Sequence, residues 1–301
     1  MSGNANNTGS HAREGHTQRV ASPVITACIC THNGSERLVE SLWSLVCQSA
    51  PNELFEILVV DNASDDAAET RALVHDFLQQ GHCVGLVVEP NLGLAHAKNT
   101  AVKNAHGEYV YFLDDDAVAN PRLVESYLEA IAQHRPDVLG GHIHPMFDIL
   151  PPPEMDYSQW SIWSLRHFGA GDRWLEDGEY FLGGNLCVNR SLLEDRPHDP
   201  SLGRCGGELR GGEEWYLGDP SFKRRMVEGG YIFHHAKEDR THLDYALRIS
   251  CAPAPRPAPT TNGSRKVRGS YLLNAWAREV ALVFKRIAFQ LRLARASRRA
   301  G

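Results

Sequence analysis

The amino-acid sequence predicts an α/β fold with a doubly wound, mixed and mainly parallel sheet. Strand-like and helix-like segments alternate four times between residues 24 and 134, and one of the strands is apolar throughout. This alternation is typical of parallel strands joined by helices that cover both faces of a sheet. Polar residues follow each strand, at the edge where such sheets bind their ligands.

The expected strands are short apolar runs, and the helices between them carry apolar residues at intervals of three and four. The run FEILVVD is typical of a strand that is buried on both faces. Pro121 is expected at the first position of the last of these helices. The strands are expected at residues 24–31, 55–61, 83–89 and 109–113, and the helices at 35–48, 65–80, 93–105 and 120–134.

The second half of the sequence is less regular. Residues 180–188 are expected to form a further strand, and residues 213–228 a further helix. Alternating Pro and Ala at residues 253–259 indicate an extended linker. The expected organisation is a disordered polar tail at 1–22, an α/β domain at 23–250, a Pro-rich linker at 251–268 and a basic amphipathic helix at 269–301.

The charge of the chain is divided unevenly. Residues 263–301 contain ten Lys and Arg and one acid, whereas the rest of the chain has an excess of acids. Apolar and basic residues fall on opposite sides of the helix expected at 271–298. One hypothesis is that this helix contacts an anionic membrane surface. The alternatives are that it packs on the α/β domain or forms a homodimer; no basic patch indicates nucleic acid.

The cysteines and the apolar runs bear on the location of the protein. The chain has seven cysteines at spacings that match no zinc pattern, which is typical of free thiols in a reducing cytoplasm. Residues 1–22 lack the apolar run of a signal peptide, and no run of 18 apolar residues occurs. We therefore expect a cytoplasmic protein, located at the inner face of the cell membrane if the basic helix docks there.

Three adjacent carboxylates, Asp114, Asp115 and Asp116, follow the strand YVYFL. Adjacent carboxylates at the end of a buried strand repel one another unless a cation neutralises them. Oxygen ligands suit Mg²⁺ or Mn²⁺. Alternate residues of an extended chain point the same way, so Asp114 and Asp116 are expected to serve one site. The alternative is an acidic turn at the surface.

Six motifs in order resemble those of the family 2 glycosyltransferases, which have the GT-A fold. The resemblance covers roughly residues 24–248. Each motif is weak alone, and their order and spacing make the signal specific. The motifs are THNG at 31–34, VVDNAS at 59–64, EPNLGLAHAKN at 89–99, FLDDD at 112–116, GGN at 183–185 and GGEE at 211–214.

The resemblance implies a site for the nucleotide of a sugar donor. Asp61 is implied to accept a hydrogen bond from the base, and an Asx turn is the alternative. Lys98 stands where the family often has Arg, and a solvated helix residue is the alternative. The residues implied to bind the nucleotide or the donor are Thr31, Asn33, Asp61, Asn91, Lys98, Asp114 and Asp115.

The resemblance also implies a metal site and a catalytic base. Asp116 and Asp114 are implied to bind Mn²⁺ or Mg²⁺, with His235 as a further ligand and His234 and His242 as alternatives. Glu214 is implied to be the base that deprotonates the acceptor, and Glu213 is the second candidate. The alternative for both glutamates is the general preference of acids for helix N-termini.

Two further groups are candidates for contact with sugars. Gly183, Gly184 and Asn185 are implied to let the backbone pass close to the donor sugar or the acceptor, and a bulge in an edge strand is the alternative. Trp160, Trp163 and Trp174 either stack on sugar rings or pack in the core.

The expected function is inverting transfer of a sugar from a nucleoside-diphosphate donor, with UDP as the default nucleotide. The acceptor is a hydroxyl on a glycan, a lipid-linked molecule or a small molecule. The rival hypotheses are a metal-dependent nucleotidyltransferase or phosphohydrolase, and a non-catalytic sugar-binding protein on the same fold. The set of Asp114, Asp116, Glu213 and Glu214 argues against a protein without catalytic activity.

Overall fold

The computed structural model describes residues 22–147, 165–206 and 208–236. The expected tail, linker and terminal helix, the membrane or dimer contact through 271–298, and His242, Trp160 and Trp163 lie outside the described residues. In the described part of the chain, no helix has both the length and the apolar character needed to span a bilayer.

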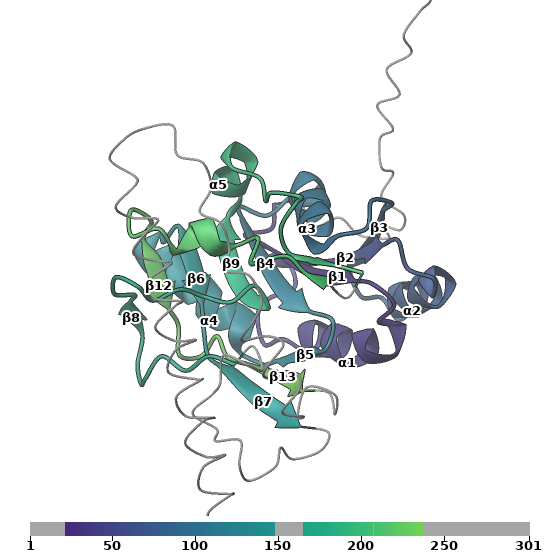
Figure 1. Cartoon of the computed structure of the whole chain (residues 1–301). Helices are drawn as coiled ribbons and strands as arrows, with labels where there is room; N and C mark the ends of the chain where they lie inside the picture. Colours follow the sequence, from purple (N-terminus) through teal and green to yellow (C-terminus); the bar gives the residue numbers. More distant parts are fainter. Residues whose placement is uncertain (1–21, 148–164, 207, 237–301) are drawn as a thin grey trace, which may run out of the picture.

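An eight-stranded mixed sheet forms the centre of the structure, in the order β3-β2-β1-β4-β9-β6-β12-β8 (Figure 1). The first four strands in this order are parallel, as expected. Strand β9 is antiparallel to both of its neighbours, β12 is parallel to β6, and β8 is antiparallel to β12. The strands are β1 (Ile25–Thr31), β2 (Phe55–Asn62), β3 (Val84–Glu89), β4 (Tyr109–Asp114), β6 (Val138–Gly140), β8 (Arg173–Trp174), β9 (Asn185–Asn189) and β12 (Arg224–Met226).

Helices cover both faces of this sheet. One hydrophobic cluster joins the sheet to α1, α2 and α4, and a second joins the opposite face to α3 and α5. Figure 1 shows α3 and α5 on the side of the sheet away from α1. The helices are α1 (Ser35–Val46), α2 (Ala67–Gln79), α3 (Leu94–Asn104), α4 (Leu123–His134), α5 (Arg190–Asp195) and the 3₁₀ helix η2 (Trp215–Gly218).

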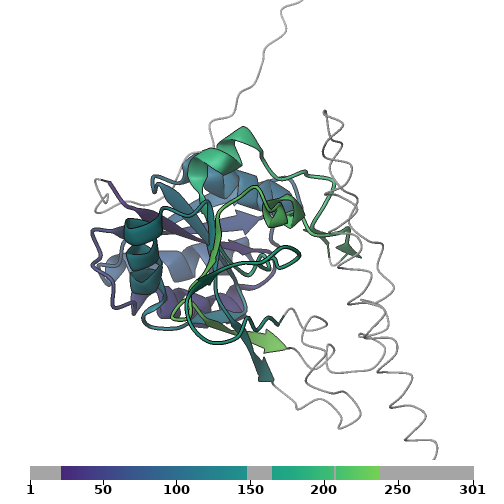
Figure 2. The ribbon, with the colours of Figure 1, turned by 90° about the vertical axis from the view of Figure 1, so that its left-hand side faces the viewer.

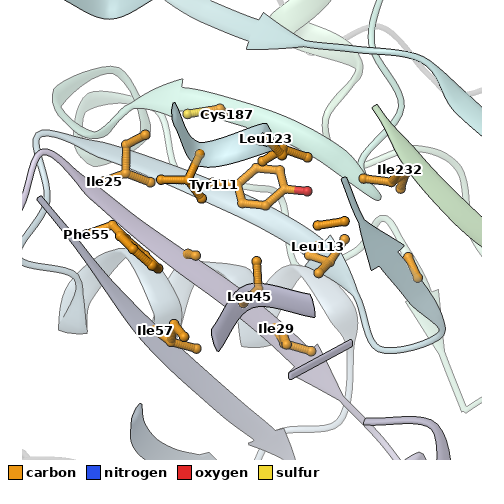
Figure 3. Packing of buried hydrophobic residues seen from close by; sticks show 14 of the residues in the cluster. Ile25, Ile29, Leu45, Phe55, Ile57, Tyr111, Leu113, Leu123, Cys187 and Ile232 are labelled. Carbon is orange, nitrogen blue, oxygen red and sulfur yellow. The ribbon is translucent and has the colours of Figure 1, made fainter. Parts of the chain in front are cut away.

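The alternation of side chains along the central strands produces the two cores. In β1, Ile25 and Ile29 belong to the first cluster, and Cys28 belongs to the second. Figure 3 shows Ile25 and Ile29 in the first cluster, with the Tyr111 ring of β4 close by. Because successive side chains of a strand point to opposite faces, a strand that is apolar throughout serves both cores.

A small sheet of three strands, in the order β5-β13-β7, lies beside the main sheet (Figures 1 and 2). Strand β5 (Ala117–Ala119) directly follows the acidic triplet and pairs with β13 (Ile232–Ala236), which pairs in turn with β7 (Ile143–Phe147). A separate hairpin consists of β10 (Arg204–Cys205) and β11 (Glu208–Leu209). The small sheet thus brings the end of the described chain next to the acidic triplet.

The structure confirms the first four predicted strand-and-helix pairs and corrects two boundaries. Helix α4 begins at Leu123 and Arg122 is its N-cap, so Pro121 precedes the helix. The strand predicted at 180–188 is confined to β9, because the chain turns between Leu182 and Asn185 before it enters the sheet.

The helix predicted at 213–228 is wrong. Only the short η2 forms there, and β12 then joins the main sheet. The sequence Gly218-Asp219-Pro220 explains the difference, because Gly weakens a helix and the residue before Pro is biased away from helical conformation. Pairing with β6 and β8 then favours an extended strand over the helical spacing of the apolar residues.

Gly107, between α3 and β4, provides a test of the packing. A Cβ at this position would lie 2.5 Å from the Thr26 nitrogen, a backbone atom of β1. We expect Gly107→Ala to lower the free energy of unfolding by about 1–3 kcal/mol, because backbone must move to accept the methyl group. Urea denaturation measures this loss. The control, Lys103→Ala at the exposed end of α3, should change stability by less than about 0.5 kcal/mol. Equal stability of the two variants would contradict the close approach.

Candidate active site

The register of the parallel strands brings the predicted polar residues to one edge of the sheet. Thr31 of β1 pairs with Asp61 of β2, and Cys30 pairs with Asp114 of β4. The next pair along the sheet is Asn62 with Glu89 at the end of β3. The convergence that the sequence predicts is therefore present, and these strand ends form the floor of the candidate site.

Asn33 holds the two loops that follow β1 and β2 together. Its Oδ1 accepts a hydrogen bond from the Asp65 N–H at 2.7 Å, and its own N–H donates to Ser64 Oγ at 3.1 Å. Asn33 has a φ of 53°, a left-handed conformation that Asn tolerates better than most residues. Asn33 is exposed at the rim of the site, and its side chain is engaged in joining the loops.

Asp61 forms the Asx turn that the sequence offers as the alternative to a contact with the base. Its Oδ1 accepts a hydrogen bond from the Ser64 N–H at 3.1 Å, which is the contact of an Asx turn. Its Oδ2 is buried and has no hydrogen-bond partner among the described residues. Leaving a carboxylate oxygen buried and unpaired costs free energy. Asp61 Oδ2 is thus a position at which an N–H group of a ligand would be stabilised.

Asn62 and Glu89 shape the loop after β3, and the sequence reasoning missed the role of both. The Asn62 amide donates to the Asn91 carbonyl at 2.7 Å and accepts from the Gly93 N–H at 2.8 Å. Glu89 Oε1 accepts from the backbone N–H and the side-chain amide of Asn91. The position of Asn62 and Glu89 at strand ends was the signal available in the sequence.

The side chains of the acidic triplet point in two directions, and the turn at Asp115 and Asp116, between β4 and β5, sets these directions. Asp115 accepts a hydrogen bond from the buried Thr31 hydroxyl at 2.6 Å. Asp114 and Asp116 instead face buried His234, whose Nε2 lies 3.4 Å from Asp114 Oδ2 and 3.3 Å from Asp116 Oδ1. Asp115 therefore ties the triplet to β1, while the two flanking aspartates share a site with His234.

The structure corrects the choice of histidine. His235 Nε2 lies 3.0 Å from Glu40 Oε2, and the backbone N–H of His235 donates to the Asp116 carbonyl. The reason is the alternation of β13, in which His234 and His235 point to opposite faces. The sequence reasoning named both histidines and preferred the wrong one of the pair for the position beside the aspartates.

Asp114, Asp116 and His234 fit a divalent cation. One potential ligand atom from each residue lies within 4.8 Å of the other two. Two carboxylates and an imidazole form a donor set that Mn²⁺ accepts, and carboxylate oxygens alone suit Mg²⁺. This fit rests on the chemistry and the proximity of the three side chains.

Lys98 is buried in an ion pair and is not a solvated helix residue. Its Nζ lies 2.5 Å from Glu213 Oε1, and the two side chains are only 2% and 4% exposed. Burial favours the neutral form of Lys98, but the carboxylates of Glu213 and Glu214 outweigh it and raise the pKa of Lys98. Burial likewise opposes ionisation of Glu213, but Lys98 holds the pKa of Glu213 below its ordinary value.

Two further residues hold the backbone of Glu213 in place. His198 Nδ1 lies 3.2 Å from the Glu213 carbonyl oxygen, and Asn99 exchanges two hydrogen bonds with the backbone of His198. The Glu213 side chain and its backbone are therefore both attached to α3, through Lys98 and through Asn99. This attachment fixes the position of the next residue, Glu214.

The carboxyl group of Glu214 has a higher pKa than that of Glu213. Its Oε1 accepts a hydrogen bond from the Gly183 N–H at 3.2 Å, and its Oε2 is buried with no hydrogen-bond partner among the described residues. Burial and repulsion from the Glu213 carboxylate raise the pKa of Glu214 to about 8. Neighbouring acids whose pKa values are pushed apart are typical of acid–base sites.

The loop at Gly183 and Gly184 passes close to both groups of charged residues. A Cβ at Gly183 would lie 2.7 Å from Lys98 Nζ, and a Cβ at Gly184 would lie 2.3 Å from Asp114 Oδ2. Asn185, by contrast, is structural. Its amide donates to the carbonyls of His142 and Gly230 and accepts from the Tyr127 hydroxyl. The Asn185 side chain is therefore engaged in internal hydrogen bonds.

Trp174 is also distant from the candidate site in the order of the sheet. It belongs to the edge strand β8, which is separated from β4 by three strands. The guanidinium of Arg225 lies over its ring. The position of Trp174 therefore favours packing against Arg225 over contact with a sugar at the candidate site.

Comparisons with known proteins agree with this geometry. The chain is 33% identical over 110 residues to poly(ribitol-phosphate) beta-N-acetylglucosaminyltransferase TarS of Staphylococcus aureus (strain Mu50), an alignment that covers 36% of this chain and 19% of TarS. It is 34% identical over 102 residues to the uncharacterized glycosyltransferase YfnE of Bacillus subtilis, covering 34% of this chain and 25% of YfnE. The chain therefore spans a quarter or less of the length of these curated relatives.

Solved structures show a shared fold. The structure of S. aureus TarS 1–349 in complex with UDP-GlcNAc superposes with a TM-score of 0.53 at 21% identity, covering 71% of this chain and 59% of that one. Mannosyltransferase PcManGT from Pyrobaculum calidifontis, in complex with GDP-Man and Mn²⁺, gives a TM-score of 0.56 at 20% identity, covering 91% and 76%. Both likenesses confirm the expected GT-A-like architecture. The family model for glycosyl transferase family 2 matches residues 26–196, more than half of the chain, and the chain therefore belongs to glycosyl transferase family 2.

Proposed function

We propose that this chain transfers a sugar, with inversion, from a nucleoside-diphosphate donor to an acceptor hydroxyl. The main support for the proposal is that a set of cation ligands and a separate carboxyl group lie at one edge of the sheet. Asp114, Asp116 and His234 form a cation-binding set, while Glu214 is a distinct carboxyl group with a raised pKa. The loop at Gly183 and Gly184 lies between them. TarS and PcManGT, which share the fold, bind UDP-GlcNAc and GDP-Man respectively.

The nucleotide is proposed to lie over the ends of β1 and β2. Asp61 Oδ2 is the buried acceptor available to an imide or amide N–H of the base. We propose UDP as the nucleotide, since uracil offers such an N–H group. Asn62 and Glu89 hold the loop that contains Asn91 in place beside this position.

Asp114, Asp116 and His234 are proposed to hold Mn²⁺ or Mg²⁺. A divalent cation there supplies positive charge that offsets the charge developing on the departing diphosphate. Mn²⁺ is present in the complex of PcManGT. Thr31 and Asp115 contribute by fixing the direction of the triplet relative to β1.

Glu214 is proposed to be the catalytic base. In its ionised form it removes the proton from the acceptor hydroxyl as the acceptor oxygen bonds to the anomeric carbon on the face opposite the leaving diphosphate. Attack from that face inverts the configuration. A base with a pKa near the working pH is effective, because it is available as the carboxylate and binds the proton well. Glu213 is unsuited to this role, since its carboxylate is occupied by Lys98.

The cation site is tested with Asp116→Ala. We expect loss of metal-dependent release of nucleoside diphosphate from a panel of nucleotide sugars, because the variant lacks a ligand. Electron paramagnetic resonance with Mn²⁺ and UDP should show weaker Mn²⁺ binding by the variant. Asp76→Ala on the exposed surface of α2 is the control and should behave like the unmodified protein. Unchanged Mn²⁺ affinity and unchanged release by Asp116→Ala would reject the site.

The base is tested with the pH profile of transfer and with Glu214→Gln. Because only the ionised carboxylate accepts a proton, kcat/KM should rise with pH and level off above the Glu214 pKa of about 8. Glu214→Gln should bind UDP normally in calorimetry and show no transfer at any pH. Full transfer by Glu214→Gln, or a profile that is flat between pH 6 and 9 in the unmodified enzyme, would refute the assignment.

Lys98 is tested with Lys98→Met. Its positive charge lowers the pKa of Glu214, so its loss should move the rise in kcat/KM to higher pH. The variant also leaves Glu213 buried without its partner, which should cost about 3–5 kcal/mol of stability in urea denaturation. Lys98→Met/Glu213→Gln removes the unpaired charge and should recover part of that loss.

In Lys98→Met/Glu213→Gln, the rise in kcat/KM should occur at a lower pH than in the unmodified enzyme. The reason is that Glu213 raises the pKa of Glu214 more than Lys98 lowers it. Identical pH profiles and additive stability changes among the variants would show that the ion pair of Lys98 and Glu213 does not control the pKa of Glu214.

A further inference from the structure

A buried arginine of β12, Arg224, contacts both chain segments that meet at Glu214. One segment leads to Gly183, whose N–H donates to the Glu214 carboxylate, and the other is η2, which directly follows Glu214. Arg224 Nη1 donates to the carbonyl of Glu179, four residues before Gly183. It also donates to the carbonyl of Gly218, four residues after Glu214, at 3.1 Å. Arg224 therefore joins the segment that carries the hydrogen-bond donor to the segment that carries the acceptor.

The path from Arg224 to Gly183 is held at two points. Arg224 Nη2 donates to the Glu176 carbonyl at 3.4 Å, so the guanidinium holds both ends of the turn at residues 176–179. The Phe181 ring then packs so closely on β6 that a Cβ at Gly140 would lie 2.3 Å from Phe181 Cδ1. Displacement of the turn would therefore be passed on along a short and tightly packed stretch to the Gly183 N–H.

Folding stability alone does not favour an arginine at this position. Arg224 is only 4% exposed, and its hydrogen bonds within the described residues all go to backbone carbonyls. Burial lowers the pKa of Arg224, which shows that its charge lies where it costs free energy. An apolar side chain of similar volume would fill the same space without that cost. The rigid fork of N–H donors is instead suited to fixing several carbonyls at once.

The neighbouring Arg225 provides an internal comparison. Its guanidinium lies over the Trp174 ring and 3.8 Å from Asp172 Oδ2. Successive side chains of a strand point to opposite faces, so Arg225 lies on the other face of β12 from Arg224. Two adjacent arginines of one strand thus differ in whether they contact the segments at Glu214.

We propose that Arg224 is a positioning residue, which holds the Glu214 carboxylate in the direction of the acceptor hydroxyl. A base must lie within hydrogen-bond reach of the proton that it removes, and a displacement of about 1 Å can cost roughly 100-fold in rate. Arg224 acts indirectly, through the backbone of the two segments that meet at Glu214. Lys98 and Glu213 are the charged groups that act on the pKa of Glu214, whereas Arg224 sets its place. This inference rests on the proposed function and adds a residue to it.

The kinetic test compares Arg224→Met with Arg225→Met in the full-length protein with Mg²⁺. The measured quantity is release of nucleoside diphosphate from the best donor in the panel of nucleotide sugars. We expect kcat to fall roughly 10- to 100-fold in Arg224→Met, because the base is no longer held in place. The KM for the donor and the Kd of UDP should change less than about twofold, since three strands separate β12 from β1. Arg225→Met should retain kcat.

The hydrogen bond between Gly183 and Glu214 gives a measurement that does not depend on activity. As Glu214 ionises, its bond to the Gly183 N–H strengthens, so the signal of this amide proton should move downfield with a midpoint near the Glu214 pKa of about 8. NMR of protein labelled with ¹⁵N-glycine follows this change. Arg224→Met should reduce it by at least about half, and Arg225→Met should retain it. If Arg224→Met does not fold, Arg224→Lys and Arg225→Lys replace the pair, because Lys keeps the charge but lacks the fork of donors.

Equal kcat in the Arg224 and Arg225 variants, or an unchanged titration of the Gly183 amide in the Arg224 variant, would overturn the positioning role. A fall in kcat with an equal loss of UDP affinity would also overturn it, since this would indicate general damage to the site. If the unmodified protein released no nucleoside diphosphate, the proposed function would be contradicted, and the Gly183 titration would still decide the role of Arg224.

Discussion

The parallel register of β1, β2 and β4 is the constraint on which the site depends. It places Thr31 beside Asp61, and Cys30 beside Asp114, so that the last residues of three strands meet at one edge. A shift of β4 by one residue would exchange the faces of its side chains. Asp114, the last residue of β4, would then no longer face His234. The two hydrophobic cores enforce the register, since the same shift would move the buried side chains of β4 to the wrong core.

This edge concentrates negative charge, and the protein separates that charge into groups with different properties. Lys98 neutralises Glu213 inside the structure, whereas burial and the Glu213 carboxylate raise the pKa of Glu214. Gly184 of the same loop approaches Asp114, one of the aspartates proposed to bind the cation. A proton acceptor and a cation site can thus lie close together without sharing ligands. The proposed chemistry requires this arrangement, because the acceptor loses a proton on one side of the sugar while the diphosphate leaves on the other.

The spacing of apolar residues predicted the first half of the fold well, because each strand and helix there shows the apolar periodicity of its own secondary structure. The sequence also predicted that Asp114 and Asp116 share a site, although a turn after β4, and not an extended strand, brings them together. It could not choose between His234 and His235, since that choice depends on how β13 pairs with β5, more than a hundred residues away. The ion pair between Lys98 and Glu213 is equally non-local. The predicted helix at 213–228 failed because tertiary pairing of β12 outweighed local spacing.

The central claim is that Asp114, Asp116 and His234 hold a divalent cation at the diphosphate of the donor. The most direct measurement is anomalous X-ray diffraction, near the manganese absorption edge, from crystals of the protein grown with UDP and Mn²⁺. We expect a manganese peak about 2–2.5 Å from ligand atoms of these residues and next to the diphosphate. A peak held by other side chains, or UDP bound at this edge with no manganese beside it, would show that these residues are not the cation site.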